Sequence, residues 1–266
     1  MLAKAPARGA DEIVVDLEDA VAASAKDEAR ETVAGALGEP QWQGVRASVR
    51  VNAPRTPWCH LDVIAMASLP DAPGSLIVPK VESAGDLQFV ERLLDGIESA
   101  AQPSRPMRVQ ALIETAAGVD RLSEIAGASA RLDALVLGYA DLSASLGRAA
   151  TSTASWIARH DVSAIDGPYL GVAVDEGFTA AAERARDMGF DGKWAIHPAQ
   201  VSALNELFTP SSEEIEHAQA VIDALEQAER EGGHGAVALD GEMLDEAIRV
   251  AALRVLARGQ VTGSRD

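Results

Sequence analysis

Residues 108–113 read Arg-Val-Gln-Ala-Leu-Ile and are followed directly by Glu114 and Thr115. The run is largely apolar, as expected of a strand buried in a parallel sheet. Six further β-branched, mostly apolar runs occur, at Glu12–Leu17, Ser48–Asn52, Ser75–Pro79, Ala134–Gly138, Ser163–Asp166 and Lys193–Ile196. Helical patterns separate the runs, whose starts lie 26 to 36 residues apart. This spacing predicts a (β/α)8 TIM barrel, in which about 250 residues give about 31 per unit.

The helices are marked by apolar residues at helical spacing and by capping sequences. We expect helices at Lys26–Leu37 and Gly177–Met188, and a capping box at Ser83–Asp86 begins another. After the last strand, a second capping box at Ser211–Glu214 precedes a helix, and a final helix covers Asp245–Ala257. Four apolar residues share one face of the first of these two helices: Ile215, Ala218, Ile222 and Leu225.

An eight-stranded barrel needs one strand more than the seven runs supply. The chain opens on Met1–Ala5, which reads as helix. We therefore expect a barrel that lacks its first strand here, with that strand upstream of Met1. The prediction is therefore a TIM-barrel catalytic domain over residues 1–207, followed by a C-terminal helical extension over residues 208–266. An open doubly wound sheet is the alternative, and it would require a reversal of strand order.

Composition excludes several functional classes. The 266 residues carry 23 Lys+Arg against 41 Asp+Glu, a formal net charge of −18. This balance argues against a nucleic-acid partner and against docking on anionic membranes. Cys59 is the only cysteine, so an intrachain disulfide is impossible. Because the chain contains neither an apolar run of about 18 residues nor a recognisable signal sequence, we expect a cytoplasmic protein.

In a TIM barrel, functional residues gather at the carboxyl ends of the strands. Glu114 ends one predicted strand, and Asp141 lies just past the end of the next. Neighbouring strands are about 4.8 Å apart, so both carboxylates can reach one ion. Mg²⁺ usually takes one or two carboxylates together with waters and substrate oxygens, which suits this pair. The alternative is that both are ordinary acidic residues of βα loops.

Arg50 stands within a valine-rich strand, where a charge is costly without a partner or a function. Either it forms a structural ion pair with Asp16 or Glu18, or it acts on a ligand. The turn that contains Asp16, Glu18 and Asp19 could equally serve to cap the following helix. His197 is expected to be a hydrogen-bonded structural residue.

A series of motifs in chain order resembles one family. They are Asp16-Leu-Glu-Asp-Ala-Val21, Val49-Arg-Val-Asn52, Pro79-Lys-Val-Glu-Ser83, Ala111-Leu-Ile-Glu-Thr-Ala116, Gly138-Tyr-Ala-Asp-Leu142, Ala164-Ile-Asp-Gly-Pro168, Gly189-Phe-Asp-Gly-Lys193, Ile196-His-Pro198 and Asp240-Gly-Glu-Met-Leu-Asp245. Together they resemble the CitE-like (citrate lyase beta subunit-like) branch of the HpcH/HpaI aldolase and citrate lyase family. The resemblance covers nearly the whole chain.

The resemblance implies a Mg²⁺-dependent carbon–carbon lyase. Its substrate would be the CoA thioester of a hydroxy-dicarboxylic acid (malyl-, citramalyl- or citryl-CoA), and its products acetyl-CoA and a 2-oxo acid. It implies that Glu114 and Asp141 bind the metal, and that Arg50 is both catalytic and substrate-binding. It also implies a homo-oligomer, a trimer, in which Asp245 of the extension acts as a catalytic residue in a neighbouring subunit's site.

The remaining roles also follow from the resemblance. The family's substrate-binding segment corresponds to Glu114, Thr115 and Ala116. The acidic turn, Asp16, Glu18 and Asp19, would support Arg50 and metal-bound water. Lys26 and Arg30 either meet CoA phosphates or belong to a solvated helix face. The segment between Gly147 and Ser163 is short, with little room for a helix.

Two other functions stay open. The first keeps the site but hydrolyses the thioester, as a malyl-CoA thioesterase or in a malate synthase-like reaction. The second is a non-catalytic paralogue that binds acyl-CoA.

Overall fold

A computed structural model of the protein describes residues 2–70, 72–103, 105–145, 163–230, 237–239, 242–244 and 246–262. Asp245 and the whole segment 147–162 lie outside the described residues. The chain forms two compact units, Met1–Leu204 and Asn205–Asp266. None of the helices in the described ranges is both long and apolar enough to cross a membrane.

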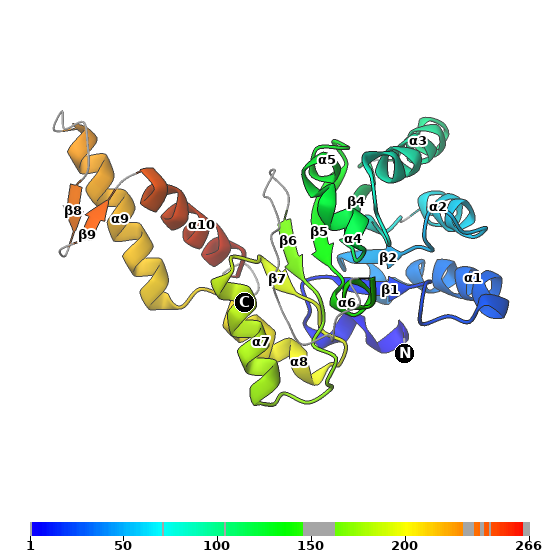
Figure 1. Ribbon diagram of the computed structural model, residues 1–266, viewed down its shortest axis with the longest axis horizontal. Helices are drawn as coiled ribbons and strands as arrows, with labels where there is room; N and C mark the ends of the chain where they lie inside the picture. The colour runs from blue at the N-terminus through cyan, green and yellow to red at the C-terminus, as the bar shows by residue number, and fades with distance from the viewer. Residues whose placement is uncertain are drawn as a thin grey trace. The chain divides into compact units, whose positions relative to one another are not determined.

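The first unit is built on a parallel sheet of seven strands in chain order (Figure 1). The strands are β1 Ile13–Asp16, β2 Ala47–Arg50, β3 Ser75–Val78, β4 Arg108–Ile113, β5 Leu132–Leu137, β6 Ser163–Asp166 and β7 Gly192–Lys193. Each strand pairs in parallel with the next. The sheet curls into a half-barrel, consistent with a TIM-barrel-like fold. Because the strand order has no reversal, the doubly wound alternative is wrong.

Helices follow the strands along the outer side of the curl (Figure 1). They are α1 Lys26–Leu37, α2 Cys59–Ala67, α3 Ala84–Ala101, α4 Ala116–Asp120, α5 Leu122–Ala126, α6 Tyr139–Ser145, α7 Glu176–Asp187 and α8 Ala199–Phe208. The predicted capping box of α3 is confirmed, because the amide of Ser83 donates to Asp86 Oδ2 at 2.9 Å.

The prediction of a helix at the start of the chain is wrong. Residues Leu2–Lys4 and Pro6–Arg8 form two separate 3₁₀ turns. Pro6 has no amide hydrogen and cannot donate to the carbonyl of Leu2, so an α-helical turn cannot propagate here.

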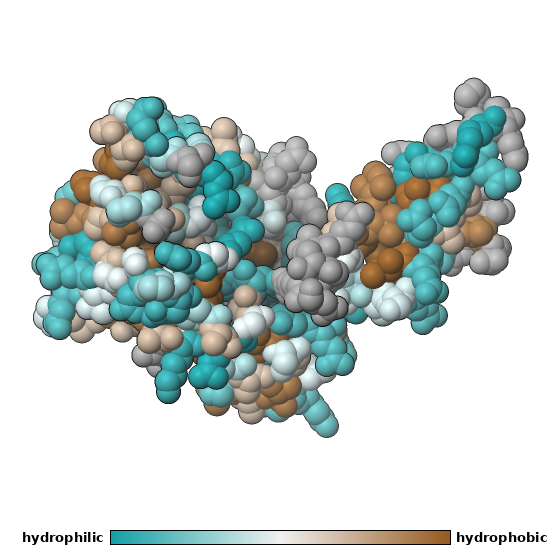
Figure 2. Space-filling view, turned by 180° about the vertical axis from the view of Figure 1, so that it is seen from behind, coloured by the Kyte–Doolittle hydropathy of each residue, from teal (hydrophilic) through white to brown (hydrophobic). Residues whose placement is uncertain are grey.

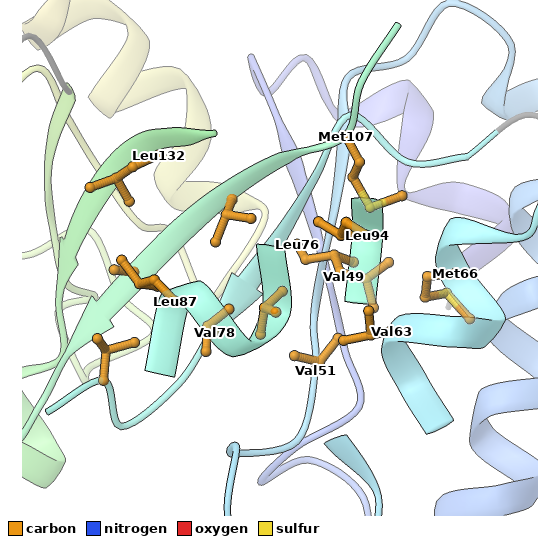
Figure 3. Packing of buried hydrophobic residues seen from close by; sticks show 14 of the residues in the cluster. Val49, Val51, Val63, Met66, Leu76, Val78, Leu87, Leu94, Met107 and Leu132 are labelled. Carbon is orange, nitrogen blue, oxygen red and sulfur yellow. The ribbon is translucent and has the colours of Figure 1, made fainter. Parts of the chain in front are cut away.

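Two apolar layers cover the two faces of the sheet, as the side-chain alternation of a strand requires. Leu76 and Val78 of β3 face the helices and belong to one buried cluster with Val63 and Leu94 (Figure 3). Ile77 between them faces inward. It packs in a smaller cluster of central strand residues, Ile77, Leu112 and Val136, which Val14 and Ile165 adjoin. The inner face is thus apolar at mid-strand.

The second unit packs helix α9, Ser212–Arg230, against α10, Glu246–Thr262. Its buried cluster comprises Ala218, Val221, Ile222, Leu225, Leu244 and Ala252, which include three of the four residues of the predicted apolar face. The capping box at Ser211 is confirmed by the 2.8 Å bond from its amide to Glu214 Oε2. An antiparallel hairpin, β8 Val237–Leu239 and β9 Glu242–Leu244, was not predicted. Figure 2 shows hydrophobic atoms at the surface of this unit, and α10 exposes Ile248, Val250 and Leu253.

Candidate active site

Three ionisable side chains continue the inner face beyond its apolar layer. Glu114 comes two residues after Leu112, and Asp16 two residues after Val14, so each points to the same side as that inner residue. Arg50 pairs with Asp16 in the register of β1 and β2. The carboxyl ends of parallel strands meet at one edge of a sheet, and this edge therefore concentrates charge.

Arg50 is held by acidic residues at the end of β1 and in the turn after it, so the ion pair that the sequence left as one of two alternatives is present. Its Nε donates to Asp16 Oδ1 at 2.8 Å and its Nη2 to Asp16 Oδ2 at 2.6 Å. Burial works against the charge of Arg50, but the hydrogen bonds and charge of Asp16, together with the charges of Glu18 and Asp19, outweigh it and leave the pKa raised. Arg50 therefore presents a permanently charged, fixed guanidinium at the inner edge of the sheet.

Asp16 fixes the turn as well as the arginine. Its Oδ1 accepts the amide of Glu18 at 2.8 Å, and its Oδ2 accepts the amide of Ala20 at 3.2 Å. Burial would raise the pKa of Asp16, but the hydrogen bond and charge of Arg50, together with these amides, leave that pKa lowered. Asp16 thus stays ionised and connects the turn rigidly to β2.

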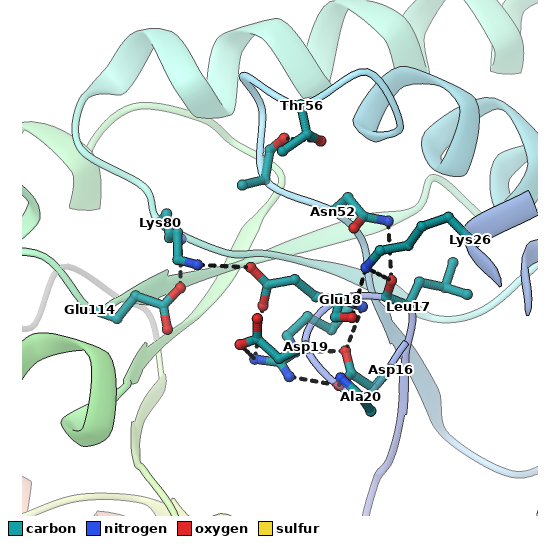
Figure 4. A network of polar contacts seen from close by, with 12 residues as sticks. Asp16, Leu17, Glu18, Asp19, Ala20, Lys26, Asn52, Thr56, Lys80 and Glu114 are labelled. Carbon is teal, nitrogen blue, oxygen red and sulfur yellow. Dashed lines mark hydrogen bonds and ion pairs between the residues drawn. The ribbon is translucent and has the colours of Figure 1, made fainter. Parts of the chain in front are cut away.

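Glu18 lies between two cations, as Figure 4 shows for its lysine partner. Its Oε1 is 3.4 Å from Nζ of Lys80, and its Oε2 is 3.0 Å from Nη1 of Arg50. Burial raises the pKa of Glu18 in spite of both cations. Asp19, by contrast, is largely exposed and lies 3.7 Å from Nη1 of Arg50.

Glu114 is almost fully buried and has one hydrogen-bond donor in the described part of the chain. Its Oε1 accepts the main-chain amide of Lys80 at 2.9 Å (Figure 4). Burial, reinforced by the charges of Glu18 and Asp141, raises the pKa of Glu114 to about 7. A Cβ at Gly138 would lie 2.8 Å from Glu114 Oε2, so any residue larger than glycine at this position would displace the carboxylate.

The carboxylates of Glu114 and Asp141 fit a divalent cation that keeps several waters. Glu114 follows β4 and Asp141 lies in the first turn of α6 after β5, and these two strands pair directly. The residues described contain no group of three or more Asp, Glu, His and Cys that could form a complete cage. Mg²⁺ does not need such a cage, because one or two carboxylates suffice when substrate and water supply the other oxygens. Burial and the charges of Glu18 and Asp141 raise the pKa of Glu114 although the charge of Lys80 opposes them, so a further cation at this pair would favour the ionised form of Glu114.

Two residues considered for CoA phosphates are occupied elsewhere. The Lys26 ammonium is buried and donates to the carbonyls of Leu17 at 2.8 Å and Glu18 at 2.7 Å. The Arg30 guanidinium donates to Asp62 at 2.7 Å and to Asp27 at 2.8 Å. Both expectations, phosphate binding and a solvated helix face, are therefore wrong. Lys26 supports the turn after β1, and Arg30 links α1 to α2.

The other candidates have identifiable structural bonds. Thr115 Oγ1 accepts the amide of Gly118 at 3.1 Å and caps α4. The amide of Ala116 donates to Ser145 Oγ at 3.0 Å. His197 Nδ1 accepts the amide of Ala199 at 3.2 Å, as expected for a structural histidine. Burial raises the pKa of the Cys59 thiol to about 12, so it is not a nucleophile.

Two buried polar groups near the site were missed from the sequence. Asp62 Oδ2 accepts the amide of Asn52 at 2.9 Å and its side-chain amide at 2.6 Å, which fixes the segment after β2. Lys193 forms a buried ion pair with Asp166 and donates to the carbonyl of Gly167 at 2.7 Å. Asp62 could have been found from the sequence, because it is a charged residue within an apolar run. The Lys193–Asp166 pair could not, because only the fold brings the ends of β6 and β7 together.

A sequential parallel β/α sheet with ionisable side chains at its carboxyl edge defines a TIM-barrel-like enzyme with its active site at that edge. The family model described as HpcH/HpaI aldolase/citrate lyase matches residues 1–198. The chain belongs to this family, as its motifs predicted.

Similar proteins include two of Cereibacter sphaeroides. The chain is 35% identical to an L-malyl-CoA/beta-methylmalyl-CoA lyase, over 91% of this chain and 85% of the lyase. It is 37% identical to a (3S)-malyl-CoA thioesterase, over 97% of this chain and 90% of the thioesterase. Among solved structures, CitE of Mycobacterium tuberculosis, in complex with magnesium, acetoacetate and coenzyme A, has a TM-score of 0.72 and 29% identity. That match covers 97% of this chain and 92% of CitE.

Proposed function

We propose that this protein is a Mg²⁺-dependent carbon–carbon lyase that cleaves a hydroxy-dicarboxylic acyl-CoA into acetyl-CoA and a 2-oxo acid. The observation that carries the proposal is the convergence of Glu114, Asp141 and Arg50 at one edge of the sheet within one compact unit. The malyl-CoA lyase relatives and the CitE complex support the substrate class.

Glu114 and Asp141 would hold the Mg²⁺. When bound, the metal supplies a Lewis acid that polarises the oxygens of the 2-oxo acid portion. The raised pKa of Glu114 supports this assignment, because a cation would favour its ionised form.

Arg50 acts on the thioester half of the substrate. As the carbon–carbon bond breaks, the substrate hydroxyl loses its proton and becomes the carbonyl of the 2-oxo acid, and the electron pair of the bond stays on the acetyl-CoA fragment as an enolate. The guanidinium stabilises the negative charge on the enolate oxygen, and it does so without reorganising because Asp16 already fixes it. Glu114, Thr115 and Ala116 form the substrate-binding segment, in which a substrate oxygen would replace Ser145 Oγ as acceptor of the Ala116 amide.

We propose further that the functional unit is a cytoplasmic homotrimer. The sheet would be part of an eight-stranded TIM barrel over residues 1–207 whose first strand is not among the seven described. The C-terminal extension, residues 208–266, would bring Asp245 to a neighbouring subunit's site, where it protonates the enolate carbon. The exposed apolar residues of α10, Ile248 and Leu253 among them, support a contact with another subunit.

The test is a product analysis. Purified protein is incubated with malyl-, citramalyl- or citryl-CoA, with and without Mg²⁺, and the products are separated by mass. The lyase releases acetyl-CoA and a 2-oxo acid, and this release stops in Glu114→Gln. Mg²⁺-dependent release of free CoA without acetyl-CoA would instead favour thioester hydrolysis, the second candidate, which the thioesterase relative supports. Binding of acyl-CoA without turnover would indicate a non-catalytic paralogue.

A further inference from the structure

Lys80 adopts an unusual backbone conformation directly after β3. Its φ is 52°, in the left-handed region that disfavours residues with a Cβ. Among the described non-glycine residues only Gln102, with φ 51°, shares this feature. Gln102 is the C-cap of α3, where a left-handed residue is common. Lys80 caps no helix, so the contacts around it must favour its conformation.

The left-handed turn aims the Lys80 amide at Glu114, to which it donates at 2.9 Å. The next residue is pinned on both sides. The Val81 amide donates to the Leu112 carbonyl at 3.3 Å, and a Cβ at Gly118 would lie only 2.5 Å from the Val81 carbonyl oxygen. The end of β3 is therefore clamped between β4 and α4, and its amide is preorganised toward the carboxylate.

The side chain of the same residue reaches the other half of the site. Lys80 Nζ lies 3.4 Å from Glu18 Oε1 (Figure 4). Glu18 Oε2 is 3.0 Å from Arg50 Nη1 but makes no hydrogen bond with the described residues, although it is buried. Arg50 Nη1 consequently has no hydrogen-bonded acceptor within the described chain, whereas Nε and Nη2 are bound to Asp16.

We propose that Lys80 is a positioning residue for both halves of the site. Its main-chain amide orients Glu114 toward the cation, and its ammonium draws Glu18 away from a full hydrogen bond with Arg50, which leaves Nη1 open to a substrate oxygen. This inference rests on the proposed function, since it takes Glu114 as a Mg²⁺ ligand and Arg50 as the group that meets the substrate.

The role of the amide is tested with Lys80→Asn and Lys80→Val. Both lack the ammonium, but asparagine tolerates the left-handed conformation and the β-branched valine does not. Loss of a hydrogen bond to a metal ligand typically weakens metal binding about 10- to 100-fold. We therefore expect the Mg²⁺ dissociation constant, measured by calorimetry without substrate, to rise at least about tenfold in Lys80→Val. Lys80→Asn should bind Mg²⁺ at least about three times more tightly than Lys80→Val. Equal constants in the two variants would overturn the inference.

The control separates strain from metal binding. Gln102→Val places valine at the other left-handed position, on the far end of α3. It should lower the melting temperature and leave the Mg²⁺ dissociation constant unchanged. If Lys80→Val does not fold, as judged by circular dichroism, Lys80→Gly and Lys80→Ala replace the first pair. Weaker Mg²⁺ binding in the alanine variant then supports the inference, and identical binding contradicts it.

The role of the ammonium is tested by kinetics at saturating Mg²⁺. Lys80→Asn should lower kcat/KM for the acyl-CoA about tenfold, and Lys80→Arg should restore it, because arginine keeps the positive charge near Glu18. Removal of the competing charge, in Glu18→Gln, should make the Lys80→Asn substitution nearly silent. An unaltered kcat/KM in Lys80→Asn would refute this half of the inference. If wild-type protein neither binds Mg²⁺ nor turns over acyl-CoA, the proposed function has failed instead.

Discussion

Arg50 and Asp16 occupy paired positions of β2 and β1 and make two parallel hydrogen bonds, of 2.8 and 2.6 Å. The two adjacent strands are thus joined, on the inner face at their carboxyl ends, by a bidentate ion pair between Arg50 and Asp16. The contact orients the guanidinium in its plane and leaves its third nitrogen, Nη1, directed toward Glu18. The geometry of the proposed enolate site depends on this pair.

Asp16→Asn should impair catalysis without affecting the metal. The amide can accept only one of the two bonds and carries no charge, so Arg50 loses its fixed orientation. We expect kcat/KM to fall about 10- to 100-fold, as for other residues that support a ligand-contacting group, while the Mg²⁺ dissociation constant stays unchanged. Asp19→Asn is the matched control. Its carboxylate is exposed and 3.7 Å from Arg50, so kcat/KM should change less than about twofold. Equal losses in both variants would contradict the assignment.

Glu114→Gln and Asp141→Asn should each abolish the Mg²⁺-dependent release of acetyl-CoA, because each removes an anionic oxygen ligand with little change of shape. In Glu114→Gln the metal-free protein should also melt at a higher temperature at pH 8, since a buried charge has been removed. Calorimetry with Mg²⁺ and thermal unfolding of the metal-free variants measure the two effects. Wild-type turnover in both variants would exclude this pair as the metal site.

Mg²⁺ binding should depend on pH through Glu114. In the folded, metal-free protein its pKa is raised to about 7 from an ordinary value of 4.5. Between these values the folded state binds more protons than the unfolded state, so the stability of the metal-free protein falls as pH rises from 4.5 to 7. Mg²⁺ needs the ionised carboxylate. Its stabilising effect should therefore be smaller at pH 6 than at pH 8.

Thermal unfolding at both pH values, with and without saturating Mg²⁺, measures this dependence. Glu114→Gln should show no Mg²⁺-induced increase in melting temperature at either pH. A wild-type increase that is equal at pH 6 and pH 8 would show that the proton and the metal do not compete for this carboxylate.

Gly138→Ala should disturb the metal site through Glu114. The new methyl group would lie 2.7 Å from Glu114 Cβ and 2.8 Å from its Oε2, so the side chain must move. Overpacking of this kind typically destabilises a protein by about 1–3 kcal/mol. We expect the Mg²⁺ dissociation constant to rise along with that loss. Gly96→Ala in α3 is the control, because a Cβ there meets nothing within 4 Å. Glycine-to-alanine changes inside a helix typically stabilise it by about 0.5–1 kcal/mol.

Much of the fold follows from local signals in the sequence. Each of the seven predicted runs overlaps a strand, although the last shares only Lys193 with β7, and β4 and β6 have the predicted bounds. Apolar runs separated by helical patterns are typical of a buried parallel sheet. The capping boxes at Ser83 and Ser211 were readable because a cap involves residues three positions apart. The pairing of β4 with β5 follows from chain order, and it places the segments that carry Glu114 and Asp141 side by side.

Tertiary structure alone decided what the charged residues do. The sequence suggests that Lys26 and Arg30 are surface cations of a helix. In the structure, Lys26 donates to the carbonyl of Glu18 and Arg30 donates to Asp62, and both acceptors are buried. The pKa of Glu114 depends on burial and on Glu18, which is 96 residues away in the chain. The left-handed Lys80 carries no local signature, since lysine is an unfavourable residue there, and its contacts with Glu114 and Glu18 join segments far apart in the chain. Local sequence determined the elements because their signals act over a few residues. The site depends on desolvation and charge, which exist only after distant segments have packed together.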